Sequence, residues 1–191
     1  MEALLIGLGG YAFAGKDAFA DALVEYEEFN KLFMSSVLRD ALHTLNPWVQ
    51  GEDQWWYRYA EYEASVGSYE ESKKNEEVRR LLQVMGTEVG RKMFGLDVWI
   101  DLLAGRVASL REAGFSVAVT GIRYPNELEW VRDNGGNAVW IDRPGTAPVN
   151  EHSSDNTLGP EDFDLTVMND GTLGDLADSA STLVRAMRWP E

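Results

Sequence analysis

The chain contains no cysteine and only two histidines among its 191 residues. The absence of thiols excludes disulfide bonds and thiolate metal sites, and two histidines are too few for a histidine-rich metal site. A sequence without cysteine fits a reducing compartment, so we expect a cytoplasmic protein.

Basic residues are scarce as well: 17 lysines and arginines stand against 32 aspartates and glutamates, which gives a formal net charge of −15. A negative field of this size opposes long polyanions, so nucleic acid is a poor candidate substrate. A small nucleotide can still bind, because local N–H groups and a few arginines outweigh distant, screened charges.

Long hydrophobic runs are missing too. The apolar segment 3–8 is short and has no basic flank, so we expect neither a signal peptide nor a membrane span. Hydrophobic residues still make up 45% of the chain, which is enough for the core of one domain spanning residues 1–191.

A glycine-rich loop, Gly10-Tyr-Ala-Phe-Ala-Gly15-Lys16-Asp17, directly follows that apolar segment. Its spacing fits the phosphate-binding pattern G-x-x-x-x-G-K-[ST] at every position but the last. Glycines let backbone N–H groups turn toward one anion, and the helix that follows adds its positive N-terminal end. An ordinary strand–turn–helix with a glycine-rich turn is the alternative. If the loop binds a nucleotide, Lys16 reaches the outer phosphates, and the other contacts come from Gly10, Ala12, Phe13, Ala14, Gly15, Asp17 and Ala18.

The final residue of the loop is anomalous, because Asp17 stands where the pattern has a hydroxyl. Beside a triphosphate, a second anion repels unless a cation lies between them. Mg²⁺ prefers oxygen ligands, so Asp17 is a candidate metal ligand, directly or through water. Its alternative role is to stabilise the N-terminus of the following helix, which is worth about 0.3–1 kcal/mol.

Strand and helix patterns alternate along the chain, which predicts an α/β fold with a mainly parallel five-stranded sheet covered on both faces. Ligands of such sheets bind at the carboxyl ends of the strands. Residues 48–72 are aromatic and acidic, and we expect helices with irregular breaks there. The expected strands are near 3–8, 30–35, 115–120, 137–142 and 164–168, and the expected helices near 16–27, 37–45, 76–94, 96–113, 126–134 and 173–187.

Four further stretches carry distinctive residues: Met34-Ser-Ser-Val-Leu-Arg39 with Leu45-Asn-Pro47, Leu82-Gln-Val-Met-Gly-Thr-Glu-Val-Gly-Arg91 through Asp97-Val-Trp99, Gly121-Ile-Arg-Tyr-Pro-Asn-Glu127, and Asn169-Asp-Gly-Thr-Leu173. Together with the loop, they resemble the bacteriophage-type deoxynucleoside monophosphate kinases of the P-loop kinase superfamily. The resemblance implies a three-layer αβα P-loop kinase fold, with a helical acceptor-binding insertion at 36–94 and a lid-like loop at 143–162. It also implies phosphoryl transfer from ATP to a deoxynucleotide 5′-phosphate with Mg²⁺, in the host cytosol if the protein is viral.

The resemblance bears on two positions, Asp17 in the glycine-rich loop and Gly121 after a later strand. A Gly-Lys-Asp ending is usual in that family, so Asp17 is typical there. Relatives often carry an aspartate after the strand that ends at Thr120, whereas this chain has Gly121. The usual acidic partner of magnesium is therefore in doubt, and Asp17 becomes the carboxylate that could take up part of its task.

Three arginines are candidates to contact the acceptor phosphate. Arg91 shares a helix face with Glu88, which would hold it, and the resemblance favours this role over a surface ion pair worth under about 1 kcal/mol. Arg39 is a similar candidate, with a solvated helix residue as the alternative. Arg123 lies just past a strand end, where Glu127 would orient it; a structural salt bridge is the alternative.

Other candidates lie in the expected lid and among the aromatic residues. Arg143 begins the lid and would close on the transferring phosphoryl group, and His152 would join it or simply be exposed. Trp99 belongs to the family-like Asp-Val-Trp run, so it would line a base pocket or pack in the core. The aromatic residues at 48–62 would stack on a base, be buried, or form a homodimer contact.

We therefore predict a kinase that transfers the γ-phosphoryl group of Mg-ATP to a deoxynucleoside monophosphate. One alternative is a P-loop kinase for another acceptor, such as a hydroxymethylated base in DNA or a small phosphorylated metabolite. The other is a nucleotide-binding module without turnover, which the absent strand-end aspartate favours.

Overall fold

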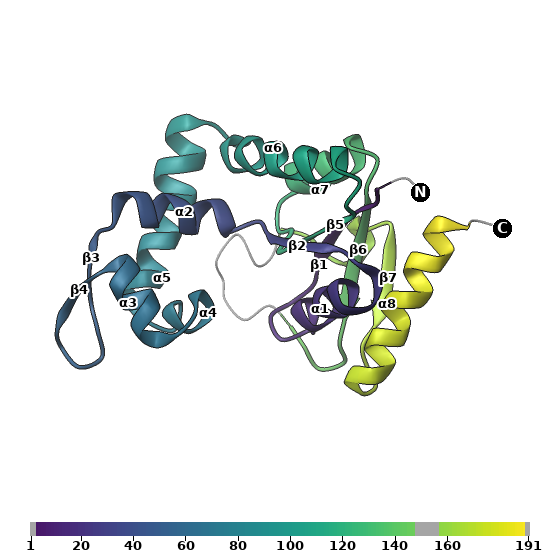
Figure 1. The fold of residues 1–191 in the computed structure, drawn as a ribbon, viewed down its shortest axis with the longest axis horizontal. Helices are drawn as coiled ribbons and strands as arrows, with labels where there is room; N and C mark the ends of the chain where they lie inside the picture. The colour runs from purple at the N-terminus through teal and green to yellow at the C-terminus, as the bar shows by residue number, and fades with distance from the viewer. Residues whose placement is uncertain (1–2, 148–156, 190–191) are drawn as a thin grey trace. The chain divides into compact units, whose positions relative to one another are not determined.

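The computed structural model describes residues 3–147 and 157–189, which form two compact units (Figure 1). The sheet unit comprises Met1–Met34 and Ala104–Glu191, and the inserted unit comprises Ser35–Leu103. The helical region predicted at 36–94 falls within the inserted unit. A single kinase domain over residues 1–191 stays a prediction.

The sheet unit is built on five parallel strands in the order β2-β5-β1-β6-β7, so the predicted α/β class is confirmed. The first strand along the chain lies in the centre, with β5 and β2 on one side of it and β6 and β7 on the other. In sheets whose strands extend to both sides of the first strand in this way, ligands bind at the carboxyl ends of the central strands. The strands are β1 Leu5–Gly9, β2 Asn30–Phe33, β5 Val117–Thr120, β6 Asn137–Asp142 and β7 Leu165–Met168.

Strand β1 has Ile6 and Leu8 toward one face of the sheet, and Leu5 followed by Gly7 and Gly9 toward the other. Ile6 and Leu8 are fully buried in the main core. A Cβ added to Gly7 would lie 2.7 Å from Cγ2 of Val131, and one added to Gly9 would collide with the ring of Phe163. The alternation lets neighbouring elements approach the central strand closely on one face.

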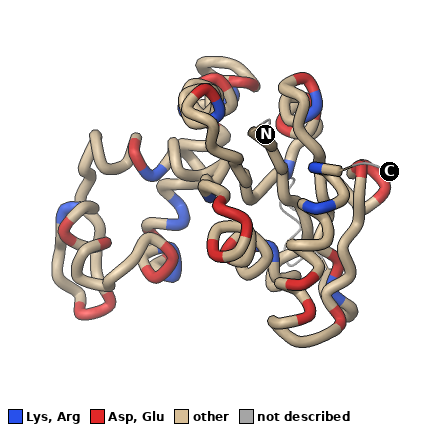
Figure 2. Tube along the Cα trace, turned by 45° about the vertical axis from the view of Figure 1, so that its right-hand side comes forward, with Lys and Arg blue, Asp and Glu red and all other residues tan. Residues whose placement is uncertain are grey.

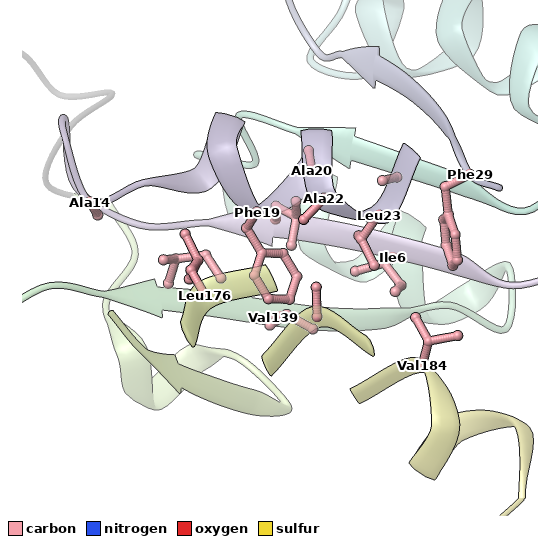
Figure 3. Close-up of a cluster of buried hydrophobic side chains, with 14 residues drawn as sticks. Ile6, Ala14, Phe19, Ala20, Ala22, Leu23, Phe29, Val139, Leu176 and Val184 are labelled. Atoms are coloured by element: carbon pink, nitrogen blue, oxygen red, sulfur yellow. The ribbon is translucent and has the colours of Figure 1, made fainter. Parts of the chain in front are cut away.

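Helices cover both faces of this sheet (Figure 1). On one face, Phe19 and Leu23 of α1 pack with Leu176 and Val184 of α8 over the strands (Figure 3). On the other face, Val131 of α7 packs against Gly7 of β1. The described helices of this unit are α1 Lys16–Glu27, α7 Pro125–Asp133 and α8 Leu173–Arg188, with the 3₁₀ turn η2 at Pro160–Asp162; α6 Val98–Glu112 begins in the inserted unit and continues into the sheet unit from Ala104.

The inserted unit is mainly helical around a small core of its own. That core contains Leu42, Val49, Tyr59, Tyr62 and Val78. The helices are α2 Ser36–Leu45, α3 Tyr59–Val66, α4 Tyr69–Ser72 and α5 Glu76–Gln83, followed by the π-helix η1 Val84–Phe94; β3 Trp48–Gln50 and β4 Trp56–Arg58 form a hairpin.

Two local predictions for the inserted unit were wrong. Residues 48–72, expected to form helices with irregular breaks, are helical only from Tyr59 onward. Their first part forms the β3–β4 hairpin, where Arg58 lies over the ring of Trp48 and Tyr57 donates to Asp53. The helix expected over 76–94 becomes a π-helix at Val84, which widens its turns and changes the direction of later side chains. Met93, near the end of this π-helix, is 71% exposed.

Charged residues of both signs are interspersed along the chain (Figure 2). Among the described residues, no helix combines the length and the apolar composition needed to cross a membrane.

Candidate active site

The glycine-rich loop leaves the carboxyl end of β1 and enters α1, as the sequence predicts. Gly10 and Gly15 have φ values of +141° and +97°, and Phe13 has φ +65° in the left-handed region. A Cβ on Gly10 would lie 2.6 Å from the carbonyl oxygen of Ile141. Both backbone conformation and close approach therefore require glycine at position 10.

Lys16 begins α1 and folds back across the loop. Its Nζ donates to the carbonyl oxygens of Gly10 at 2.8 Å and Tyr11 at 2.7 Å. These bonds hold the ammonium group over the loop, beside the positive N-terminal end of the helix. An anion lying on the loop would meet a lysine already in position.

Asp17 points toward solvent and contacts a lysine from the neighbouring strand β2. Its side chain is 63% exposed, and its carboxylate lies 3.4 Å from Nζ of Lys31, which also contacts Asp21 at 2.9 Å. No cluster of three or more potential metal-ligating side chains occurs within the described part of the chain. Mg²⁺ commonly uses one or two carboxylates together with phosphate oxygens and water, so the exposed carboxylate of Asp17 fits such an ion.

The departure at Gly121 has a conformational basis. Gly121 has φ +84°, which a residue with a side chain adopts only with strain. Its N–H and that of Ile122 both donate to the carbonyl oxygen of Leu8 at 3.1 Å, so the chain turns sharply at the end of β5. The turn explains glycine at this position.

Arg123 follows that turn, and Glu127 fixes its backbone. The Glu127 carboxylate is 2% exposed and accepts hydrogen bonds from the N–H groups of Arg123 at 2.7 Å and Tyr124 at 3.2 Å. These bonds cap the start of α7. Glu127 therefore holds the main chain from which the exposed Arg123 side chain projects.

Arg143 is exposed and follows β6 directly, so it belongs to the same strand-end edge as Lys16 and Arg123. Its carbonyl accepts from both the N–H and the hydroxyl of Thr146, which forms a turn. The rest of the lid-like loop predicted at 143–162 is described only in part: residues 148–156, including His152, lie outside the described residues.

In the inserted unit, Arg39 is held by a carboxylate that sequence reasoning missed. Glu63 is 5% exposed and accepts from Nε and Nη2 of Arg39, from the hydroxyl of Tyr59 at 2.8 Å, and lies 3.2 Å from Nε2 of His43. The Arg39 side chain remains 41% exposed, so it can be oriented by Glu63 and still meet an anion. The spacing of four residues between Tyr59 and Glu63 on one helix could have indicated their contact, but not the contact of Glu63 with Arg39.

The environment of Glu63 favours its charged form. Burial alone would raise the pKa of Glu63, but the hydrogen bonds from Arg39 and Tyr59 hold that pKa below its ordinary value of 4.5. Burial, together with the hydrogen bond to Glu63, raises the pKa of the Tyr59 hydroxyl, which therefore stays protonated and donates.

We predict that Glu63→Gln lowers the free energy of unfolding by about 1.5–3 kcal/mol at neutral pH, because charged hydrogen bonds are lost. A carboxylate whose pKa is depressed by folding stabilises above its unfolded-state pKa and loses this effect as pH falls through the folded-state value. The difference in the free energy of unfolding between the wild type and Glu63→Gln should therefore become smaller at acidic pH. Urea unfolding at several pH values measures it, with exposed Glu70→Gln as the control; a difference that does not change with pH would contradict the prediction.

The π-helix η1 carries the second group of predicted acceptor residues. Arg91 donates from Nη1 to the carbonyl oxygen of Leu96 at 3.3 Å, and Glu88 accepts hydrogen bonds from Lys92. Trp99 is 7% exposed, donates from Nε1 to the carbonyl of Gly86 at 2.9 Å, and packs so closely on Gly90 that a Cβ there would collide with the ring. This packing favours the core role of Trp99 over the base-pocket role.

The predicted residues thus fall into two groups. Lys16, Asp17, Arg123 and Arg143 share the carboxyl edge of the sheet unit, whereas Arg39, Glu88, Arg91 and Trp99 belong to the inserted unit.

A sequence model described as deoxynucleotide monophosphate kinase matches residues 46–179. The chain belongs to this family. The matched segment includes the distinctive stretches at 82–99, 121–127 and 169–173, but it begins after the glycine-rich loop. The loop and the family match are therefore separate observations that point to the same class of protein.

Two curated relatives are deoxynucleotide monophosphate kinases of phages. That of Escherichia phage RB69 is 30% identical over 109 residues, which cover 56% of this chain and 45% of the relative. That of Enterobacteria phage T4 is 27% identical over 111 residues, covering 58% and 46%. The chain spans about half the length of the curated relatives it matches.

Solved structures with little sequence identity share the fold. Shikimate kinase from Aquifex aeolicus vf5 superposes with a TM-score of 0.52 at 11% identity, covering 98% of this chain and 100% of that one. TT1252 from Thermus thermophilus gives 0.51 at 14% identity, covering 98% and 99%. The predicted P-loop kinase fold is confirmed.

Proposed function

We propose that this chain is a deoxynucleoside monophosphate kinase that transfers the γ-phosphoryl group of Mg-ATP to a dNMP, giving a dNDP and ADP. The observation that carries the proposal is the glycine-rich loop at the carboxyl end of the central strand, with the ammonium group of Lys16 held over the loop by its carbonyls. Membership of the deoxynucleotide monophosphate kinase family supports the acceptor class.

Phosphoryl transfer needs alignment and positive charge more than covalent chemistry from the protein. Lys16 and the loop N–H groups would hold the donor phosphates. An oxygen of the acceptor phosphate attacks the γ-phosphorus, and the bond from that phosphorus to the ADP oxygen breaks. Mg²⁺, when bound by Asp17 and the phosphates, would neutralise charge on the transferred group.

Arginines are the candidates to contact the acceptor phosphate. Arg39, oriented by Glu63, and Arg91 project from the inserted unit, and we assign this unit to acceptor binding. Arg123 would contact the acceptor phosphate from the strand-end edge, and Arg143 would close with the lid-like loop. Guanidinium groups suit this task because their planar donors match phosphate oxygens.

A coupled assay of ADP release tests the proposal, with the four standard dNMPs, modified dNMPs, small phosphorylated metabolites and duplex DNA as acceptors. Turnover with at least one dNMP is the expected result. Turnover with DNA or with a metabolite alone would establish a kinase for another acceptor. ATP binding without turnover on any acceptor would establish a nucleotide-binding module and overturn the proposal.

We predict that Asp17→Ser raises the magnesium concentration needed for half-maximal turnover by about tenfold or more, because a carboxylate binds this ion better than a hydroxyl. Asp21→Ser is the matched control, since Asp21 also contacts Lys31 but lies one helical turn beyond the loop. Magnesium titrations at saturating ATP measure the effect. An Asp17→Ser protein with unchanged activity and magnesium dependence would exclude a direct carboxylate requirement.

A further inference from the structure

Asn169 joins the phosphate loop to the far strand of the sheet, and it lies outside the residues already assigned a role. It directly follows β7 and is 6% exposed. Its Nδ2 donates to the carbonyl oxygen of Ala14 at 2.8 Å, and its backbone N–H donates to the carbonyl oxygen of Asp142 at 2.7 Å. One buried residue therefore connects β7, the end of β6 and the loop.

The amide of Asn169 lies against the interior side of the loop. A Cβ added to Gly15 would collide with Nδ2 of Asn169 and lie 3.5 Å from Cδ2 of Leu176, which is buried in the main core. Gly15 is thus required by this contact as well as by its φ of +97°. Figure 3 shows Ala14 and Leu176 at this end of the core.

The contact also determines the direction of one loop N–H group. No cis peptide bond occurs in the described residues. In a planar trans peptide, the carbonyl and the following N–H point in opposite directions. Because the carbonyl of Ala14 points inward to Asn169, the N–H of Gly15 points away from the interior.

We propose that Asn169 is a positioning residue that holds the Ala14–Gly15 peptide so that the Gly15 N–H faces a phosphate of the bound nucleotide. This inference rests on the proposed function for the identity of the nucleotide. A backbone N–H that is already aimed at the phosphate saves the cost of ordering the loop on binding. Asn169 thereby acts on the donor side of the reaction.

The proposal makes the amide nitrogen the essential atom. In Asn169→Asp the shape is kept, but an ionised carboxylate presents an oxygen to the carbonyl of Ala14 and repels it. A protonated carboxyl group can donate instead, and burial favours the protonated form. The substitution therefore makes the orientation of the peptide depend on pH.

The test measures dissociation constants of ATP and of inorganic tripolyphosphate by calorimetry from about pH 8 to about pH 6, each relative to the wild type at the same pH. Asn169→Asp should weaken both by about 10- to 100-fold at the higher pH, with the loss shrinking as pH falls. Asn169→Ser, whose hydroxyl is too short to reach, should weaken both at every pH. Asp170→Asn, at the exposed neighbouring position, should leave binding unchanged. The KM for dNMP should stay near the wild-type value in every variant.

Urea unfolding distinguishes positioning from a general loss of structure. Unchanged affinity for ATP and tripolyphosphate in both Asn169 variants would overturn the inference. It would also be overturned if Asn169→Asp lost affinity equally at every pH and in proportion to its decrease in the free energy of unfolding. If the wild type binds ATP and tripolyphosphate but phosphorylates no acceptor, the proposed function fails while the comparison at Asn169 still decides this inference. Absence of binding to both probes would overturn both.

Discussion

Lys16→Met is expected to lower kcat by about 10²- to 10³-fold while the protein remains folded. The ammonium group of Lys16 already lies over the loop, held by the carbonyls of Gly10 and Tyr11. Methionine keeps much of the side-chain length and volume but removes the positive charge. The decrease in kcat should therefore come from the lost stabilisation of negative charge on the transferred phosphoryl group, and not from altered packing.

The measurement is steady-state turnover with ATP and the best dNMP acceptor, together with urea unfolding. Lys74→Met is the matched control, because the Lys74 side chain is 69% exposed and pairs with Glu71, three residues earlier in the inserted unit. We expect this control to keep wild-type turnover. Retention of more than about a tenth of the turnover in Lys16→Met would show that the lysine is not the main donor contact.

The elements of the sheet unit could be predicted because their patterns are local. α1 and β6 have the bounds expected from the sequence, and β5 and β7 differ by at most two residues at one end. Buried parallel strands are continuous apolar runs, and the helices between them show a clear apolar face. Both signals are read from neighbouring residues, so the order of elements and the fold class followed.

The inserted unit was harder because its structure depends on contacts between segments. The β3–β4 hairpin is stabilised by pairs such as Arg58 with Trp48, which lie ten positions apart in the sequence. In η1, the change from α to π geometry accompanies the packing of Trp99 on Gly90 and its hydrogen bond to Gly86. An apolar period of 3.6 residues carries no information about such a change.

The same distinction applies to the candidate site. The glycine-rich loop is a local motif, so its position between β1 and α1 could be predicted. Glu127 was expected beside Arg123, but the structure shows it bonding to the backbone N–H of that residue. Glu63 and Asn169 act on residues 24 and 155 positions away, and no local pattern reveals such contacts.

The second large effect is expected in Arg91→Glu, which should raise the KM for dNMP by about 10²-fold or more and change the KM for ATP much less. Arg91 lies in the π-helix of the inserted unit, which we assign to acceptor binding, whereas the phosphate loop belongs to the sheet unit. Reversing the charge replaces an attraction for the acceptor phosphate by a repulsion.

Lys92→Glu separates this role from the general effect of two added negative units on a chain of net charge −15. Lys92 is the next residue of the same π-helix, is 64% exposed and pairs with Glu88. Because distant charges are screened, Lys92→Glu should alter the KM for dNMP by only a few-fold. The two constants are measured by varying each substrate at saturation of the other. Equal increases for ATP and dNMP in Arg91→Glu would point to a disturbed fold or a shared contact, and would exclude Arg91 as a residue that acts on the acceptor alone.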